Sequence, residues 1–333
     1  MRIRRSLPLV LAVVAIAAGL TLIVQLRKHA PPEAARLLPG ADAFLYADLR
    51  WARGMSQQHQ LPAVTHDPEY ERFIQQTGFE FERDLEEAAF AVHYPSRWPG
   101  GGTGGSAPEP RYSEVLVGKF DGEKLTAYLR QSASAVESRS SVDIFSIPLE
   151  GRILRVAVLS ADSVAASNHD DPDVIRGIVD RSRRRASPFG GPLLLRQHYK
   201  HVPFASQAWV VARNTRGLRL LGTPTELSFN GAWVLSARYI RALHLRLEAF
   251  TATDTDARSL IDNLKQPLDM LRESETSVED RNADPDAKAF FESLTITQQG
   301  SRAVGTAVIP PAILKKMLIG GVSPPSSTTK DTP

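Results

Sequence analysis

Alternating and helical hydrophobic patterns divide the chain into many short elements. Alternation of apolar and polar side chains predicts a half-buried strand, whereas apolar residues at i, i+3 and i+4 predict a helix. The strand pattern recurs between turn signals such as Glu150-Gly151, which indicates a hairpin. We expect strands at 43–49, 88–94, 113–120, 142–148, 152–159, 163–167, 208–212, 227–230, 233–240, 243–253, 295–299 and 302–309.

Helices are expected between groups of these strands. Asp67 and Pro68 are typical of a helix start, and Tyr70, Phe73 and Ile74 then share one face. Other helices are expected after Asp121, from Asp171, and at 254–272, 286–294 and 310–319. The pattern at 254–272 places apolar side chains on one stripe, namely Ala257, Leu260, Ile261, Leu264, Leu268 and Leu271.

The order of these elements predicts an α+β fold with mainly antiparallel sheets. Residues 181–192 form a break that is first charged and then rich in serine, proline and glycine, so we expect two lobes. Each lobe contains a strand, a capped helix and a returning hairpin, which leaves a duplicated fold open. We expect an N-terminal membrane anchor, a spacer, a first lobe, a linker, a second lobe and a disordered tail at 1–29, 30–36, 37–182, 183–200, 201–319 and 320–333.

The N-terminal segment predicts a single membrane-spanning helix. Residues 7–24 are 18 uncharged residues, about 27 Å long as a helix, which is near the hydrocarbon thickness of a bilayer. Arg2, Arg4 and Arg5 precede them and favour an N-terminus in the cytoplasm. The alternative is a signal peptide cleaved near residues 15–17. Both interpretations place the folded part outside the cytoplasmic membrane, in the periplasm.

Charge and cysteine content exclude several classes of function. The net charge is +3, but residues 1–29 hold five basic residues and no acid, leaving 35 basic and 37 acidic residues in the rest. Nucleic-acid binding needs a basic face, so we predict no nucleic-acid partner. The absence of cysteine excludes disulfides, thiolate metal sites, a cysteine nucleophile and lipid attachment to cysteine.

Two stretches resemble known proteins. Residues 37–46, LLPGADAFLY, follow the proline-containing spacer, and residues 147–168 read IPLEGRILRVAVLSADSVAASN. With the anchor, they are similar to uncharacterised bacterial envelope proteins that carry a single N-terminal membrane anchor. The resemblance implies a place in the envelope but no activity.

One arginine cluster and one tryptophan are candidate contact residues. Arg181, Arg183, Arg184 and Arg185 exceed what a helix C-terminus needs to complement its dipole. They could contact a phosphate, an anionic lipid or an acidic partner. Trp98 lies beside a glycine-rich loop and is expected to be exposed.

The glycine-rich segment Pro99–Pro110 predicts a mobile surface loop. A phosphate-binding loop needs a lysine followed by serine or threonine after its glycines, and Gly105 is followed directly by Ser106. The rival interpretation is a loop that closes over a ligand beside Trp98.

Two further patterns favour structural roles over metal binding. His198 and His201 have the i, i+3 spacing of metal ligands on a helix, but the sequence places no third ligand near them. The acids within 168–173 lack the glycine and glutamate of a calcium loop and suit a helix cap instead. We therefore predict no metal site and no cofactor.

Catalytic motifs are also missing. The sequence has no G-x-S-x-G and no S-x-x-K with its partner motifs. We therefore expect a membrane-anchored, non-enzymatic binding or accessory protein whose partner is another protein or a component of the envelope. The alternative is an extracytoplasmic hydrolase with scattered site residues. A cleft with a buried acid or histidine would favour the enzyme, and an apolar patch would favour the binding protein.

Overall fold

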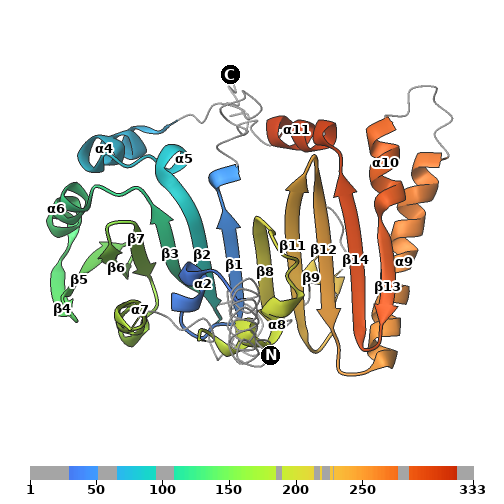
Figure 1. Ribbon diagram of the computed structural model, residues 1–333, viewed down its shortest axis with the longest axis horizontal. Coiled ribbons are helices and arrows are strands. Elements are labelled where there is room, and N and C mark those ends of the chain that lie inside the picture. Colours follow the sequence, from blue (N-terminus) through green and yellow to red (C-terminus); the bar gives the residue numbers. More distant parts are fainter. Residues whose placement is uncertain are drawn as a thin grey trace, which may run out of the picture.

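A twelve-stranded antiparallel sheet runs through the part of the molecule that the structure describes (Figure 1). The computed structural model describes residues 30–51, 66–94, 109–184, 190–213, 218–219, 226–227, 229–276 and 285–320. The strand order is β13-β14-β12-β11-β8-β1-β2-β3-β7-β6-β5-β4, and β9 and β10 form a separate two-stranded sheet. The predicted α+β class with mainly antiparallel strands is confirmed, and the strands form one large sheet.

The strands and helices have the following bounds. The strands are β1 Ala43–Asp48, β2 Leu85–His93, β3 Arg111–Gly118, β4 Ala135–Arg139, β5 Val142–Leu149, β6 Arg152–Ser160, β7 Ser163–Ser167, β8 Ala208–Arg213, β9 Leu218–Arg219, β10 Glu226–Leu227, β11 Ala232–Ile240, β12 Ala242–Phe250, β13 Thr295–Gln299 and β14 Arg302–Ile309. The helices are α2 Glu33–Leu37, α4 Pro68–Thr77, α5 Phe81–Asp84, α6 Gly122–Ser132, α7 Asp173–Arg183, α8 Leu193–His198, the 3₁₀ turn η2 Tyr199–His201, α9 Asp254–Thr276, α10 Pro285–Ser293 and α11 Pro311–Gly320.

Local capping explains why α4 lies where the sequence predicts it. The Asp67 side chain accepts hydrogen bonds from the backbone N–H groups of Glu69 and Tyr70, at 2.9 and 2.8 Å. Gly78 ends the helix with a left-handed backbone, φ 71°, which glycine adopts at little cost. The sequence predicts this helix correctly because the Asp67 cap and the Gly78 terminator each act on backbone groups only a few residues away.

The predicted membrane anchor lies outside the described residues, as does Pro99–Pro110 for most of its length. Within the described ranges, no helix combines the length and the hydropathy that a bilayer crossing requires.

Strands from both predicted lobes join in the same sheet. β1 of residues 37–182 pairs with β8 of residues 201–319, with Phe44 opposite Val211 and Tyr46 opposite Trp209. The expected spacer and linker also contribute packed helices. Ala34 and Ala35 of α2, and Leu194 and Leu195 of α8, are at most 4% exposed and belong to the main core.

The two halves of the sheet repeat one order of elements. In the first half, α2 precedes β1, the hairpin β2-β3 is followed by α6, and the returning strand β7 pairs with β3. In the second half, α8 precedes β8, the hairpin β11-β12 is followed by α9, and β14 pairs with β12. The strands β1 and β8, one from each half, are antiparallel neighbours in the sheet.

One face of the sheet carries the main core. Directly paired residues of adjacent strands share a face, so Phe44 and Trp209 lie on the same side. Helices α2, α7 and α8 pack against this side through residues such as Ile178 and Leu195, both fully buried.

Separate helices cover the two ends of the opposite face (Figure 1). At one end, Leu125 and Leu129 of α6 pack against β5, β6 and β7. At the other, Leu260, Ile261 and Leu264 of α9 pack against Ala249 and Ala303 of the sheet. Between these ends, the central strands place Leu45, Phe90, Glu114 and Ala166 in one row across the sheet.

Candidate functional site

A hollow whose exposed surface is mostly apolar lies on the central strands between the two helical ends. Its volume is about 420 Å³, and it is lined by Leu45, Phe90, Val92, Tyr112, Glu114, Leu154, Ala166, Ser167 and Asn168. Leu45 is 37% exposed and Tyr112 is 44% exposed, so part of the apolar lining is open to solvent here.

A second apolar hollow of about 330 Å³ adjoins the first beneath α4 and α6. The two share Glu114, Leu154 and Ala166. The rest of the second hollow is formed by Phe73, Phe79, Phe81, Leu116, Phe120, Leu125, Tyr128, Leu129, Ser132, Ile147, Leu149, Val156 and Val164. We call the two together the apolar groove. Their sizes fall in the range of small-molecule sites, which is roughly 300–1,000 Å³.

Stacked aromatic rings form the wall of the groove at the α4 end. Phe79 stacks on Phe120 with ring centroids 4.5 Å apart, and Phe73 meets Tyr128 edge-on at 5.4 Å. Phe73 also stacks on Phe81 at 5.9 Å. Offset and edge-to-face contacts between aromatic rings stabilise a fixed arrangement. The wall is therefore packed in place without a ligand.

Glu114 brings the one carboxyl group into the lining of the groove. Its position in β3 follows from the cross-strand row Ala166, Glu114, Phe90 and Leu45, which lies on one face. Burial among these apolar neighbours raises the pKa of the Glu114 carboxyl. Among the described residues, no hydrogen bond or ion pair satisfies this carboxylate, so it is free to meet a polar group of a ligand.

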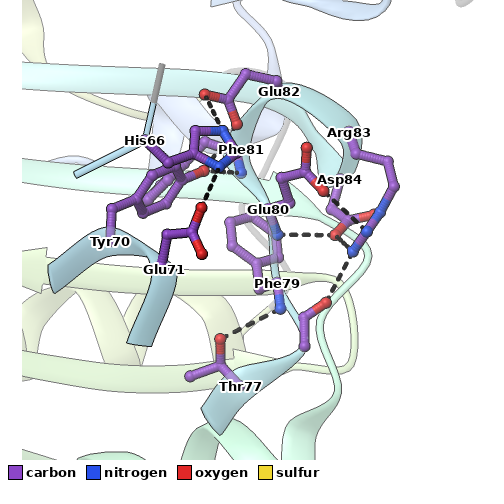
Figure 2. A network of polar contacts seen from close by, with 11 residues as sticks. His66, Tyr70, Glu71, Thr77, Phe79, Glu80, Phe81, Glu82, Arg83 and Asp84 are labelled. Carbon is purple, nitrogen blue, oxygen red and sulfur yellow. Dashed lines mark hydrogen bonds and ion pairs between the residues drawn. The ribbon is translucent and has the colours of Figure 1, made fainter. Parts of the chain in front are cut away.

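A cluster of a histidine and several carboxylates lies beside the aromatic wall (Figure 2). One ring nitrogen of His66 and one oxygen each of Glu80 and Glu82 lie within 4.8 Å of one another. Phe81, which separates the two glutamates in sequence, also lines the groove. No short sequence motif marks this cluster, because His66 lies 14 residues before Glu80.

A serine and a histidine lie within hydrogen-bonding distance on the main-core face of the sheet. His93 Nε2 is 3.0 Å from Ser113 Oγ, which is 2.9 Å from Ser167 Oγ. Burial, assisted by the nearby His169, lowers the pKa of His93 to about 4, so its ring is neutral at neutral pH. A neutral imidazole beside a hydroxyl is the arrangement of a nucleophile and its base. Ser113 is 0% exposed, however, and a substrate could not reach its oxygen.

A buried glutamate is neutralised near the other end of that face. Glu248 is 2% exposed and accepts hydrogen bonds from Arg246 at 2.8 Å and Arg302 at 2.9 Å. His201 Nδ1 is 3.2 Å from the same carboxylate. Burial is the main cause of a lowered His201 pKa. Since both carboxylate oxygens are occupied, we interpret this group as a structural ion cluster.

The two histidines of the HYKH pattern pack against an aromatic ring of β12. His198 and His201 both pack against the Phe250 ring, with centroids 4.7 and 4.6 Å away. In the acidic stretch, Asp171 accepts a hydrogen bond from the Asp173 N–H, but the residue at the N-cap of α7 is Pro172, which makes no side-chain cap bond. Asp170 pairs with Arg111.

The arginines predicted to form one contact surface lie in different environments. Arg181 is held against the core, where its Nε donates to the Leu37 carbonyl at 2.7 Å. Burial lowers the pKa of this guanidinium. Arg183 and Arg184 are exposed at the end of α7. Arg185 and Trp98 lie outside the described residues.

Comparison with known proteins assigns no family to this chain. No family model matches it, and no curated protein matches it. Three crystal forms of the protein TP0453 are similar to it in structure, with identities of 10–12%. Crystal form III has a TM-score of 0.48 and covers 88% of this chain and 99% of its own, form IV has 0.44 over 86% and 96%, and form I has 0.42 over 86% and 96%. These values are too low to transfer a function.

Proposed function

We propose that this chain is a non-enzymatic binding protein of the bacterial envelope. In this proposal, residues 7–24 hold the protein in the cytoplasmic membrane, and the folded part lies in the periplasm. Its ligand is the apolar chain of a lipid-like, amphipathic molecule, which lies in the apolar groove. The observation that carries the proposal is the groove itself, an open apolar hollow on a sheet whose other face is already packed.

The shape and lining of the groove favour a slender apolar chain over a folded protein partner. The first hollow lies on the sheet surface between side chains such as Leu45, Phe90 and Leu154, and the second continues under α4 and α6. A chain could extend from one to the other past Glu114, whereas a flat protein surface could not enter beneath the helices. The neighbouring bilayer would be the source of such molecules.

Glu114 supports an amphipathic ligand. Its raised pKa favours the protonated form, which can donate a hydrogen bond to an oxygen of the ligand. The ionised form could pair with an amine instead. In both states an apolar chain would cover the surrounding side chains, and removal of apolar surface from water is worth about 25 cal/mol per Å².

The alternative function, a hydrolase, has weaker support. Its best nucleophile and base would be Ser113 and His93, and the hydroxyl of Ser113 is fully buried. The Glu248 cluster holds an acid whose oxygens are already paired with arginines. Neither group opens into the apolar groove.

A photoreactive fatty acid carrying a diazirine tests the proposal on the full chain in membranes. After irradiation, we expect labelled peptides from the groove strands β2, β3, β6 and β7, in addition to any label in residues 7–24. Unlabelled palmitate in excess should remove the groove label. Label spread over all exposed strands, or confined to residues 7–24, would contradict the proposal.

A matched pair of variants locates the binding surface. Leu45→Glu places a charge among the apolar groove residues and should reduce the groove label at least tenfold. Val136→Glu makes the same change at an apolar β4 residue outside the groove that is 46% exposed, and it should leave the label unchanged. Because both side chains are exposed, we expect both variants to fold. The positions of the label in the unaltered chain test the proposal even if a variant does not fold.

A further inference from the structure

The cluster beside the aromatic wall has the composition of a metal site. His66 precedes α4, and Glu80 and Glu82 lie at the start of α5, so the chain must reverse over α4 to bring them together. His66 Nε2 is 3.6 Å from Glu82 Oε1. The three ligand atoms lie within 4.8 Å of one another, and Figure 2 shows their side chains converging.

We propose that His66, Glu80 and Glu82 bind a divalent transition-metal ion of the zinc type. Imidazole nitrogen and carboxylate oxygen are ligands that Zn²⁺ accepts at about 2.0–2.2 Å, which corresponds to ligand atoms about 3.3 Å apart in a tetrahedron. Small rotations of the two glutamate side chains would close the remaining distance. All three side chains are partly exposed, at 21, 28 and 34%, which leaves an entry path and room for a water as fourth ligand.

Hydrogen bonds orient both carboxylates for this role. Tyr70 Oη donates to Glu82 Oε2 at 2.7 Å, and it accepts from the Phe81 N–H at 2.7 Å, which directs its own proton toward Glu82. Arg83 Nη1 donates to Glu80 Oε2 at 2.9 Å. Each glutamate thus has one oxygen held by a donor, and its other oxygen is the one available to a metal. Metal-binding carboxylates are typically supported in this way.

A carboxylate also lies on the other side of the histidine ring. His66 Nδ1 is 4.0 Å from Glu71 Oε1, while Nε2 faces Glu82. A carboxylate near the far nitrogen of a ligating histidine favours one orientation of the ring. The ring also meets Tyr70 edge-on, with centroids 4.8 Å apart. The cluster therefore combines ligands with the partners that hold them, which an ordinary group of surface acids lacks.

Metal binding would tie the two ends of α4 together. Phe73 lies within this helix, and Phe79 and Phe81 follow it, and all three line the apolar groove. An ion on His66, Glu80 and Glu82 would hold this wall in place. Zinc binding does not depend on the proposed lipid ligand, so the two proposals can fail separately.

Calorimetric titration of the full chain with zinc tests the site. The protein should be untagged, purified in detergent and stripped of metal with EDTA. We expect saturable binding of one zinc ion per chain. His66→Ala and Glu82→Gln should each weaken it at least tenfold, and Tyr70→Phe should weaken it about tenfold through loss of the supporting hydrogen bond. Zinc should also raise the melting temperature of the unaltered chain and not that of His66→Ala.

Two control variants keep the result specific. Glu69→Gln removes an exposed α4 carboxylate outside the cluster, and His244→Ala removes a histidine on β12, and both should bind zinc like the unaltered chain. The absence of saturable binding would overturn the proposal. It would also be overturned if His66→Ala bound zinc normally, or if a small excess of calcium displaced it, because either result indicates unspecific attraction to carboxylates.

Discussion

At the scale of single residues, Glu114 owes its environment to the strands on both sides of β3. Strand alternation places Glu114 on the face opposite Ser113 and Val115, which normally means toward water. Its surroundings are set instead by Phe90 and Ala166, which pair with it from β2 and β7. The environment of Arg181 is also set by a residue distant in sequence, because the Leu37 carbonyl that it binds lies 144 residues away.

Replacing Glu114 by glutamine should make the protein more stable at neutral pH. The carboxyl has a raised pKa in the folded state, so the folded chain holds its proton over a pH range in which the unfolded chain has lost it. Stability of the unaltered protein therefore falls as pH rises through that range. Glu114→Gln has no carboxyl to ionise and so keeps its stability as pH rises. Its melting temperature should therefore exceed that of the unaltered chain at pH 7–8. The difference should shrink toward about pH 4.

A glutamate with the opposite shift provides the control. Arg176 lowers the pKa of the exposed Glu137, so this ion pair stabilises the fold at neutral pH and is lost on acidification. Glu137→Gln should therefore melt slightly below the unaltered chain at neutral pH. If Glu114→Gln also melted lower at neutral pH, the carboxylate would be ionised and satisfied, contrary to our interpretation.

At the scale of elements, the accuracy of the sequence predictions depended on length and local signals. The predicted hairpin 295–299 and 302–309 is confirmed by β13 and β14, and Ala257, Leu260, Ile261 and Leu264 of α9 are buried as expected. By contrast α2, α8 and β4 were not predicted. Each has six residues or fewer, which is too short to display a helical or alternating period. Their stability comes from tertiary packing.

Two leucines of α8 offer a direct measure of that packing. Leu195 is 0% exposed within the main core, whereas Leu193 is 53% exposed on the same helix. Leu195→Ala should lower the free energy of unfolding by about 2–5 kcal/mol, because it leaves a cavity. Leu193→Ala should change it by roughly 0.5 kcal/mol or less. Thermal unfolding of both variants in detergent checks this, and equal effects would show that residues 193–198 act only as a linker.

At the scale of the whole molecule, the sequence contained no signal for the central strand pair. β1 and β8 are far apart in the chain, and Ala43 pairs with Ala212. The two halves form one sheet only if each leaves a strand edge free for the other, and the pattern of one half alone does not reveal this. The repeated order of elements does explain it, since two similar units can pair edge to edge through equivalent strands. Each half therefore covers an edge strand of the other.

Cleavage between the halves in membranes tests whether they form one structural unit. A protease site inserted at residues 185–189 would separate a first fragment, which carries residues 7–24, from a second fragment that begins with α8. We expect the second fragment to stay with the membranes after cutting, because the β1–β8 pairing and the shared core still hold it to the first. Urea at a concentration that unfolds the protein should release it.

The possible failures of this experiment have separate meanings. Release of the second fragment alone in buffer would show that the halves are independent domains that merely touch at β1 and β8. Release of both fragments would instead contradict the retained membrane helix. An uncut sample treated with urea provides the control, since a chain anchored through residues 7–24 stays in the membrane when its folded part is denatured. Retention before urea and release after it would require both an anchor in the first half and a non-covalent core shared by the two.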